Sequence, residues 1–338
     1  MQYEFYILAF ITSVFLSLLF TPIVGSLAIR FDAIDRPSGR KIHRKSIPLW
    51  GGVAVFVGIF GTILVLKQAN PEFNKLLSQN SYSLTRTIEG ILVGAIVVTI
   101  LGMVDDMKSV AAPTKLLGQI IAAMIVMQYG IRIKGVNLPF FSSYLELPMY
   151  LSIIITVLWI IIFINSINLI DGIDGLATGV TGIAMVVFFA ITIYQISIQS
   201  ESTAVDSLKL ASVLSLVVGG GCIGFLKFNF PPGKIFLGDS GSLLLGYMAG
   251  VVTIIGILKT AATFTLIVPI LIFGVPVWDA FFSFLRRIFR KKSVMEADKD
   301  HLHHRLLYRR GWNEKKVDIC IYSVTLILGA IAFLVAVF

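Results

Sequence analysis

Long apolar stretches, separated by short polar ones, run along the whole chain. A transmembrane helix needs about 20 predominantly apolar residues, and ten stretches approach or reach that length. We therefore predict an all-α polytopic integral membrane protein, a single membrane-embedded domain over residues 1–338, with about ten transmembrane helices. The predicted spans are 5–28, 49–66, 87–104, 115–129, 148–164, 176–198, 207–225, 242–258, 261–285 and 317–338.

Composition supports this prediction and excludes a soluble globular protein. Hydrophobic residues make up 57% of the chain and charged residues 14%, whereas soluble domains carry about 25% charged residues. Both cysteines lie in apolar stretches, which argues against a disulfide framework or a cysteine zinc site. The formal net charge of +9 fits cytoplasmic loops that face anionic lipid, so we expect membrane lipids and no nucleic acid among the partners.

Lysine and arginine are distributed unequally between the two sets of loops that ten spans create. One set holds 21 of the 28 Lys and Arg residues and the other holds seven. Because cytoplasmic loops carry an excess of these residues, we place the first set in the cytoplasm and both termini outside. The loops of the first set are 30–48, 105–115, 165–175, 226–241 and 286–316.

Two loops are predicted to have structure of their own. Apolar and polar residues alternate over 130–147 on the outer side, a pattern that favours a small β-hairpin. The last cytoplasmic loop, 286–316, is the longest and the most basic. We predict that it contains a short amphipathic helix near the lipid headgroups.

Five polar clusters interrupt the apolar chain, and all five fall on the predicted cytoplasmic side. Polar groups are costly in lipid, so clusters that gather at one face of a membrane protein indicate a functional site. Their mixture of carboxylates, cations and histidines suits metal-assisted phosphate transfer. The clusters are 40–45, 105–106, 168–174, 229–242 and 298–305.

Carboxylates dominate three of the clusters. Asp105 and Asp106 are adjacent and repel each other, so a divalent cation or a bound proton would relieve their repulsion; a solvated helix end is the alternative. Asn168, Asp171 and Asp174 are spaced by three, which places them on one face of a helical turn; a capped helix start is the alternative. Asp239, together with the other four carboxylates, suits a magnesium–nucleotide site.

Histidines and basic residues fill the other two clusters. His301 and His304 would share one face of a helix, while His303 would turn away. Zinc binding is possible by spacing, but the neighbouring Arg and Lys residues favour anion binding or acid–base chemistry. The basic cluster 40–45 has a simple alternative, because positive residues also anchor the cytoplasmic ends of spans.

In this order the motifs resemble those of the polyprenyl-phosphate N-acetylhexosamine-1-phosphate transferase family, glycosyltransferase family 4. The histidine motif and the Asn168 motif resemble the N-acetylglucosamine branch more than the phospho-MurNAc-pentapeptide translocase, which has three consecutive histidines. The matching stretches are Ile47-Pro-Leu-Trp-Gly-Gly, Val104-Asp-Asp, Asn168-Leu-Ile-Asp-Gly-Ile-Asp-Gly-Leu-Ala, Lys234-Ile-Phe-Leu-Gly-Asp-Ser-Gly-Ser and His301-Leu-His-His.

This resemblance implies a reaction and a cellular place. GlcNAc-1-phosphate would pass from UDP-GlcNAc to undecaprenyl phosphate, with release of UMP, at the inner membrane of a bacterium. The lipid-linked product would start a cell-envelope polysaccharide such as teichoic acid, O-antigen or another lipopolysaccharide part. The resemblance implies Mg²⁺ as cofactor, with Mn²⁺ as a substitute. A homodimer is an allowed assembly that the sequence does not decide.

The resemblance also implies roles for individual residues. The catalytic set would contain three aspartates, which are also the metal ligands, and three histidines; Asp105 is the candidate base. A second set would hold the nucleotide, with Phe236 against the uracil, and a third would contact phosphate or sugar. The catalytic set is Asp105, Asp106, Asp239, His301, His303 and His304; the nucleotide set is Asn168, Asp171, Gly172, Asp174, Asn229 and Phe236; the phosphate and sugar set is Lys41, His43, Lys45, Lys115 and Arg305.

Other functions fit less of the sequence. Within the family, phospho-MurNAc-pentapeptide transfer is the alternative. A secondary transporter would place its ionisable groups near the middle of broken spans, whereas these clusters lie at span ends. An intramembrane aspartyl protease would not need the basic histidine cluster. A CDP-alcohol phosphotransferase motif looks partly similar to Asp171-Gly-Ile-Asp-Gly-Leu-Ala, but the further carboxylates of that motif are missing here.

Overall fold

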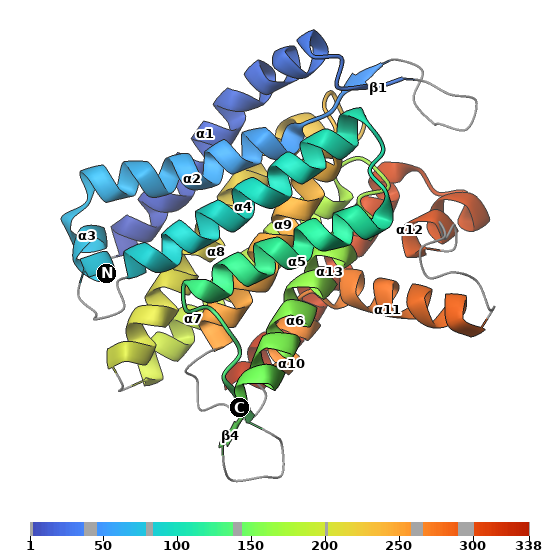
Figure 1. The fold of residues 1–338 in the computed structure, drawn as a ribbon. Coiled ribbons are helices and arrows are strands. Elements are labelled where there is room, and N and C mark those ends of the chain that lie inside the picture. The colour runs from blue at the N-terminus through green and yellow to red at the C-terminus, as the bar shows by residue number, and fades with distance from the viewer. Residues whose placement is uncertain are drawn as a thin grey trace.

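The computed structural model describes residues 3–36, 46–78, 84–137, 144–199, 202–257, 266–289 and 301–337. It is a bundle of long helices that run side by side along one direction (Figure 1). The helices are α1 (Tyr3–Arg30), α2 (Gly51–Ala69), α3 (Pro71–Ser78), α4 (Leu84–Met107), α5 (Ala112–Gln128), α6 (Met149–Ile170), α7 (Leu176–Ile198), α8 (Ser202–Asn229), α9 (Gly238–Ile257), α10 (Ile267–Ile272), α11 (Gly274–Phe289), α12 (Leu302–His304) and α13 (Glu314–Val337), and a π-helical turn covers Arg305–Arg309.

The helices confirm the predicted fold class, an all-α polytopic membrane protein. Over the described ranges, eight of them are long and apolar enough to cross a membrane: α1, α2, α4, α6, α7, α8, α9 and α13. Helix α5, with 17 residues, is apolar but shorter. The total of ten spans and the side on which the termini lie remain predictions.

The predicted span 261–285 is not one helix, and this part of the prediction was wrong. Helix α10 ends at Ile272, and α11 begins at Gly274 and crosses the direction of the bundle (Figure 1). Pro276 explains the break, because a proline has no backbone N–H and its ring collides with the carbonyl group four residues earlier. The apolar run therefore continues through the break, but the helix axis does not.

Helices α8 and α9 form the centre of the bundle. In each of them, 89% of the most apolar 18-residue stretch is buried inside the protein. The corresponding share is 28% for α1 and 22% for α13. Helix α8 packs against α7, α1 and α2, and α9 packs against α4 and α6. The central position of α9 matters for function, because its first residues carry Asp239.

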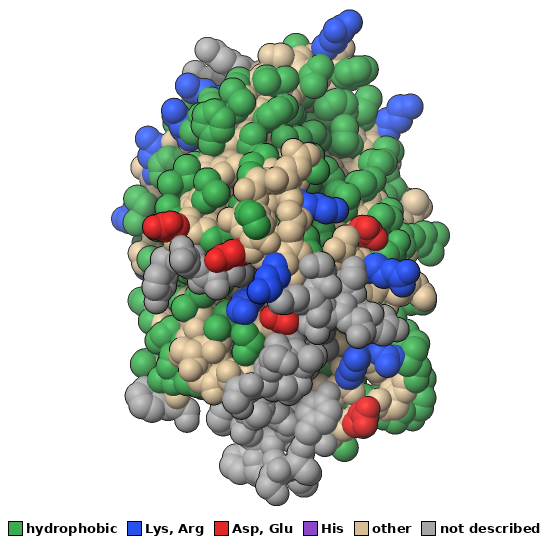
Figure 2. Space-filling model, turned by 90° about the vertical axis from the view of Figure 1, so that its left-hand side faces the viewer, with side chains coloured by type: hydrophobic (Ala, Val, Ile, Leu, Met, Phe, Trp, Pro, Cys, Tyr) green, Lys and Arg blue, Asp and Glu red, His purple; other side chains and the backbone are tan. Residues whose placement is uncertain are grey.

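The outer helices expose hydrophobic side chains, as a lipid-facing surface requires. On α1, Ile7, Phe15 and Ile29 are 57%, 59% and 60% exposed. From the side of the N-terminal helices, hydrophobic side chains cover much of the described surface, and the acidic side chains lie in its middle and lower parts (Figure 2). Such a surface would be a liability in water, but it suits a bilayer.

The ends of four helices meet at one end of the bundle. There, α4 and α6 end, α8 ends and α9 begins, whereas the N-terminal end of α1 and the C-terminal end of α13 lie at the opposite end (Figure 1). The three carboxylate clusters therefore lie together, as the alternation of loops predicted. A short hairpin at the same end pairs β1 (Ile34–Asp35) with β2 (Ile47–Pro48).

The predicted hairpin in 130–147 is present at the other end. Strand β3 (Gly135–Asn137) runs antiparallel to β4 (Tyr144–Glu146), with Val136 opposite Leu145. In the last loop, the described part contains α12 and the π-helical turn, so short helical structure is present there too.

Candidate active site

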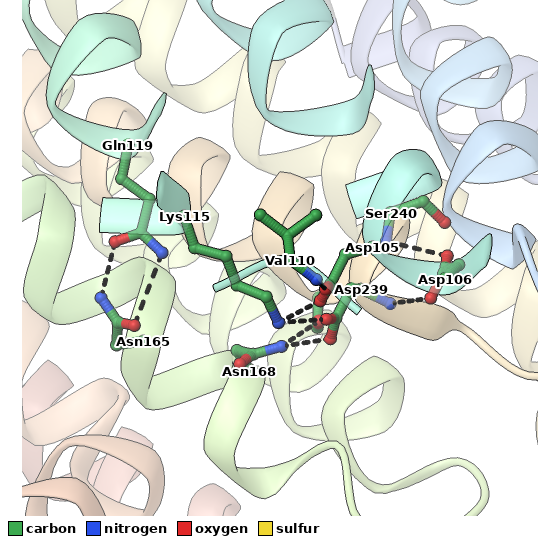
Figure 3. Close-up of polar contacts among 10 residues, drawn as sticks. Asp105, Asp106, Val110, Lys115, Gln119, Asn165, Asn168, Asp239 and Ser240 are labelled. Atoms are coloured by element: carbon green, nitrogen blue, oxygen red, sulfur yellow. Dashed lines mark hydrogen bonds and ion pairs between the residues drawn. The ribbon is translucent and has the colours of Figure 1, made fainter. Parts of the chain in front are cut away.

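Four side chains from four helices meet at the end of the bundle where α9 begins, and we call them the carboxylate centre. The Lys115 ammonium of α5 contacts both Asp105 of α4 and Asp239 of α9, the latter at 2.7 Å. Asn168 of α6 donates a hydrogen bond to the other oxygen of Asp239, also at 2.7 Å. Figure 3 shows these side chains pointing toward one another. One cation thus neutralises part of the charge of two carboxylates.

Further hydrogen bonds fix the members of the carboxylate centre. The backbone N–H of Val110 donates to Asp105 at 2.6 Å. Asn168 also donates to the hydroxyl of Ser242, one turn into α9, at 2.8 Å. Because each member is held from at least two directions, the centre is preorganised before any ligand binds.

Asp106 faces the backbone of α9 instead of the carboxylate centre. Its carboxylate accepts hydrogen bonds from the N–H groups of Asp239 at 2.7 Å and Ser240 at 3.2 Å. A carboxylate at a helix N-terminus accepts hydrogen bonds from otherwise unpaired N–H groups, and its negative charge interacts favourably with the helix dipole. The structure therefore gives Asp106 the role of a cap for α9, and its predicted role as a metal ligand remains a prediction.

Glycines bring the start of α9 close to its neighbours. A Cβ atom on Gly102 of α4 would lie 2.4 Å from the carbonyl oxygen of Asp239. A Cβ atom on Gly52 of α2 would lie 2.1 Å from the backbone nitrogen of Gly241. Both distances are far below contact, so these two positions need glycine for the helices to approach.

A cavity of about 660 Å³ opens beside the carboxylate centre, a volume within the usual range for ligand sites. The carboxylate centre borders it through Asp239, and the β1–β2 hairpin borders it through Asp35 and Ile47. Most of the predicted nucleotide set lies on its wall. The predicted site residues that line it are Asp106, Asp171, Gly172, Asp174, Asn229, Phe236, Asp239 and His304.

Acidic residues give this cavity a strongly negative wall. Asp171 caps the C-terminus of α6, close to three other carboxylates. Loss of solvent raises the pKa of Asp171 well above its ordinary value, and the negative charges of Asp239, Asp106 and Asp174 raise it further. A bound cation, or a ligand that brings one, would lower this electrostatic cost.

Two predicted nucleotide residues have structural contacts of their own. Asn229 is 2% exposed, and its side chain links the N–H of Gly175, the hydroxyl of Thr178 and the carbonyl of Ile235. Asp174 accepts a hydrogen bond at 2.7 Å from the N–H of Gly233. Both residues therefore shape the loop between α8 and α9, and their contact with a nucleotide remains a prediction.

The histidine segment, residues 301–304, lies against α11. His301 Nδ1 is 2.9 Å from Asp279 Oδ2, and the other Asp279 oxygen accepts the N–H of Leu302 at 3.0 Å. The rings of His301 and His303 stack with centroids 5.9 Å apart, and those of His303 and His304 lie 4.3 Å apart. Among the three, His304 lines the cavity.

His303 is the most deeply buried of the three histidines. It is 1% exposed, and neither ring nitrogen has a hydrogen-bond partner among the residues that the structure describes. Burial lowers the pKa of His303 to about 3, with a smaller contribution from the neighbouring His304, so its ring is neutral at physiological pH. The ring packs onto Gly172, where a Cβ atom would lie 2.3 Å from Nε2. His303 thus joins the histidine segment to the loop after α6.

The structure separates one predicted phosphate ligand from the rest of the site. Arg305 lines a second cavity of about 590 Å³ between α11 and α13, with apolar neighbours such as Trp278 and Leu328. Lys115, from the same predicted set, lies in the carboxylate centre. Lys41, His43 and Lys45 lie outside the described residues.

Sequence reasoning missed two polar contacts. Asp279 lies inside the predicted span 261–285, where an isolated carboxylate is itself a signal of function. Gln119 of α5 and Asn165 of α6 form a reciprocal amide pair, with Asn165 donating at 2.8 Å and Gln119 at 3.5 Å (Figure 3). This pair lies one turn from Lys115 and Asn168 and joins the helices that carry them.

The side chains that could coordinate a metal ion test whether the site fits the predicted Mg²⁺. Within the described ranges, no group of three or more His, Cys, Asp or Glu side chains is arranged to hold a metal ion. Asp105 and Asp239 are the two carboxylates that share one cation, the Lys115 ammonium. Mg²⁺ often takes only one or two protein carboxylates and completes its shell with water and phosphate oxygens. This pair therefore fits a magnesium ion that binds together with a phosphate substrate.

Known proteins resemble the chain over nearly its whole length. The model for the family "Glycosyl transferase family 4" matches residues 88–257. A Bacillus subtilis protein named probable undecaprenyl-phosphate N-acetylglucosaminyl 1-phosphate transferase is 36% identical, over 96% of this chain and 83% of its own length. A Mycobacterium leprae decaprenyl-phosphate N-acetylglucosaminephosphotransferase is 31% identical, over 96% of this chain and 81% of its own length.

A third relative carries a different substrate in its name. A phospho-N-acetylmuramoyl-pentapeptide-transferase from Bacillus cytotoxicus is 30% identical, over 97% of this chain and 96% of its own length. The family model's match over residues 88–257 contains the carboxylate centre and part of the wall of the larger cavity. With the family model over residues 88–257 and a relative 36% identical over 96% of the chain, the protein belongs to glycosyl transferase family 4.

Proposed function

We propose that this protein transfers GlcNAc-1-phosphate from UDP-GlcNAc to undecaprenyl phosphate, with release of UMP. The observation that carries the proposal is the carboxylate centre, built from four helix ends at one end of an apolar bundle and bordering a cavity. A lipid acceptor and a soluble sugar nucleotide would meet at such a boundary. The names of relatives support the acceptor class and the N-acetylglucosamine phosphate group.

The reaction exchanges one phosphate bond for another. An oxygen of the lipid phosphate attacks the β-phosphorus of UDP-GlcNAc, and the bond from that phosphorus to the bridging oxygen breaks. UMP leaves with the electron pair, and a lipid-linked pyrophosphoryl sugar remains. The bond between sugar and phosphate stays intact. A phosphate monoester is largely ionised at neutral pH, so the attacking oxygen needs no strong base, although the family resemblance implies Asp105 as the candidate base.

Asp105, Asp239 and Lys115 would carry the electrostatic part of this chemistry. Asp105 and Asp239 would hold Mg²⁺, or Mn²⁺ in its place, and the ion would neutralise charge on the transferring phosphate. Lys115, which contacts both carboxylates, would offer its ammonium group to a phosphate oxygen of the substrate. Asn168 keeps Asp239 in place through its 2.7 Å hydrogen bond. Most of the rate enhancement would then come from positioning and charge neutralisation.

The cavity wall would bind the sugar nucleotide. Phe236 lines the cavity, and its backbone is fixed by hydrogen bonds from its N–H to Pro48 and from Gly51 to its carbonyl. A fixed aromatic ring suits stacking on uracil. His304 lies on the same wall and would contact the pyrophosphate or the sugar. Asp171, Gly172 and Asp174 would bind the ribose and the uracil edge.

One assay tests the reaction. Purified protein with undecaprenyl phosphate, Mg²⁺ and UDP-GlcNAc should release UMP and form a lipid-linked product, and omission of the lipid should abolish both. Absence of UMP release in the complete mixture would overturn the proposal. Chelation of Mg²⁺ should stop the reaction, and Mn²⁺ should restore it in part.

The donor sugar is tested by competition. The relatives named phospho-N-acetylmuramoyl-pentapeptide-transferase make the muramyl peptide the second candidate donor. We propose that UDP-GlcNAc is used far better, because His301-Leu-His-His differs from the three consecutive histidines of the translocase form. Both donors at equal concentration decide the matter. Preferred transfer of the muramyl peptide would overturn the donor assignment and leave the reaction class intact.

We also propose that the protein resides in a bacterial cytoplasmic membrane with its site on the cytoplasmic face. The asymmetry of Lys and Arg supports this orientation. In intact cells, a membrane-impermeant maleimide should label Glu146→Cys, in the β3–β4 hairpin, and spare Lys108→Cys, next to the carboxylate centre. The opposite pattern would reverse the orientation. The homodimer stays a prediction, to be tested by the mass of the detergent-purified protein.

A further inference from the structure

The contact between α11 and the histidine segment is a buried carboxyl–imidazole pair, and no role predicted from the sequence explains Asp279. Asp279 is 8% exposed and His301 is 4% exposed. Burial of a carboxylate is costly unless hydrogen bonds compensate for the lost water. Here both oxygens are used, one by His301 Nδ1 at 2.9 Å and one by the Leu302 N–H at 3.0 Å.

This arrangement restricts the protonation of the His301 ring. A carboxylate beside Nδ1 favours a proton on that nitrogen, because the ring must donate and the carboxylate accepts. In the neutral ring, Nε2 then carries no proton and is free to accept one or to accept a hydrogen bond. A carboxylate fixes tautomer and orientation in the same way for histidines that bind metals.

Contacts between the histidine rings connect His301 to the wall of the cavity. The His301 ring is parallel to the His303 ring within 3°. The ring centroids of His303 and His304 are 4.3 Å apart, and His304 lines the cavity. On its other side, Asp279 accepts the N–H of Leu302, the first residue of α12, which carries His303 and His304 and has His301 as its N-cap residue. One carboxylate of α11 therefore sets both the ring and the backbone of the histidine segment.

We propose that Asp279 is the positioning residue for His301, holding its Nδ1–H tautomer and aligning the stacked histidines with the cavity wall. The effect of Asp279 on turnover rests on the proposed phosphotransferase function. Its effect on the His301 tautomer does not depend on any reaction. The two readouts can therefore fail separately.

The first test is spectroscopic. The chain has four histidines, so ¹⁵N-histidine labelling in detergent micelles gives few signals, and loss of one signal in His301→Gln assigns it. We expect a protonated Nδ1 in the wild type. A wild-type His301 with an unprotonated Nδ1 would overturn the proposal, and this measurement needs no variant of Asp279.

Asp279→Asn supplies the second test. The amide keeps the size of the side chain but replaces one of the two acceptor oxygens by an NH₂ donor, so it cannot accept at both the Leu302 and the His301 positions. We expect a shift toward the Nε2–H tautomer and a loss of turnover of about 10²-fold, mainly in kcat. Asp279→Glu keeps two acceptor oxygens and should restore the Nδ1–H tautomer. Asp206→Asn, a carboxylate change in α8 far from the site, is the matched control and should leave both readouts unchanged.

A double variant separates positioning from simple stabilisation of the fold. If Asp279 acts through His301, Asp279→Asn should cost little further turnover in a His301→Ala background. Additive losses, or an Asp279→Asn variant with unchanged tautomer, would overturn the proposal. If the tautomer shifts as expected while the wild type releases no UMP, the proposed reaction fails and the positioning role of Asp279 stands.

Discussion

The carboxylate centre and the histidine segment lie beside one cavity, yet the protein builds them differently. The side chains of the carboxylate centre come from the ends of α4, α5, α6 and α9. Each of these helices packs along its length against other helices of the bundle. The histidine segment belongs to a helix of three residues and a single π-helical turn. Its position depends on Asp279 on one side and on Gly172 on the other.

This difference teaches how each region should respond to change. Loss of one side chain in the carboxylate centre removes charge but leaves four packed helices in place. Loss of one contact in the histidine segment should move several groups together, because His301 stacks on His303 and His303 contacts the tilted ring of His304. Chemical and positional defects should therefore be separable in this protein.

The strongest test of the carboxylate centre is Asp239→Asn. It removes the charge that a hard cation requires but keeps an oxygen that can accept from Asn168. We expect UMP release to fall at least about 10³-fold, with weaker Mn²⁺ binding in electron paramagnetic resonance titrations and an unchanged unfolding temperature. Asp32→Asn, an exposed carboxylate paired with Arg36 at the same end of the bundle, is the control. Near-normal turnover would refute the metal assignment.

Gly172→Ala is the corresponding test of the histidine segment. The added Cβ would meet His303 Nε2 at 2.3 Å, so the ring has to move. A displacement of about 1 Å near a reacting centre can cost about 10²-fold, and we expect a loss of 10- to 100-fold with unchanged metal binding. Gly25→Ala, where the nearest atom would lie at 3.6 Å, should keep full activity. Full activity of Gly172→Ala would show that His303 is not held by this contact.

A third prediction uses pH to sharpen the comparison. The folded pKa of His303, about 3, lies below its ordinary value of 6.5. The unfolded chain therefore binds the extra proton first, and this residue makes the fold less stable as pH falls below about 6.5, by about 2 kcal/mol at pH 5. The raised pKa of Asp171 acts in the opposite direction. Replacement of His303 by Phe should reduce the loss of unfolding temperature between pH 7.5 and 5, measured by scanning fluorimetry; an unchanged loss would contradict the assignment.

The smallest expected effect concerns the amide pair between α5 and α6. Gln119→Leu removes the side chain that pairs with the Asn165 amide, which keeps its hydrogen bond to the carbonyl of Ile161. This change should lower the free energy of unfolding by about 1 kcal/mol. The double replacement of Gln119 and Asn165 by Leu removes both amides and should cost less than either single change. Unfolding temperatures in one detergent measure the series. Additive losses would show that the pair contributes no coupling.

Much of this architecture could be predicted, because apolar stretches indicate the spans and the distribution of Lys and Arg indicates which loops lie on the same side. The spans with continuous apolar sequence match helices of the bundle, and their alternation brought Asp105 and Asp239 to one end. The break before α11 could also have been found, because Gly274 and Pro276 interrupt an apolar run. Hydropathy alone does not predict where one helix ends and the next begins within a continuous apolar run.

The contacts within the site could not be predicted from the sequence in the same way. Asp105 and Asp106 are neighbours in the sequence, but one faces Lys115 and the other caps α9. Which oxygen meets which donor depends on the rotation of α4 against α9, and that rotation is set by the close packing at Gly102. Asp279 was overlooked for a related reason, since its partner His301 lies 22 residues further along the chain.

The position of the two chain ends has a practical consequence. Both the first turn of α1 and the last turn of α13 lie at the end of the bundle away from the cavity (Figure 1). The 24 residues of α13 alone span about 36 Å along the helix axis. A fluorophore, an affinity tag or a surface tether attached at either end would thus be separated from the reacting groups by the full thickness of the protein. Immobilised or labelled enzyme should turn over like the free enzyme, and two dyes on the two ends would report on the same side of a vesicle.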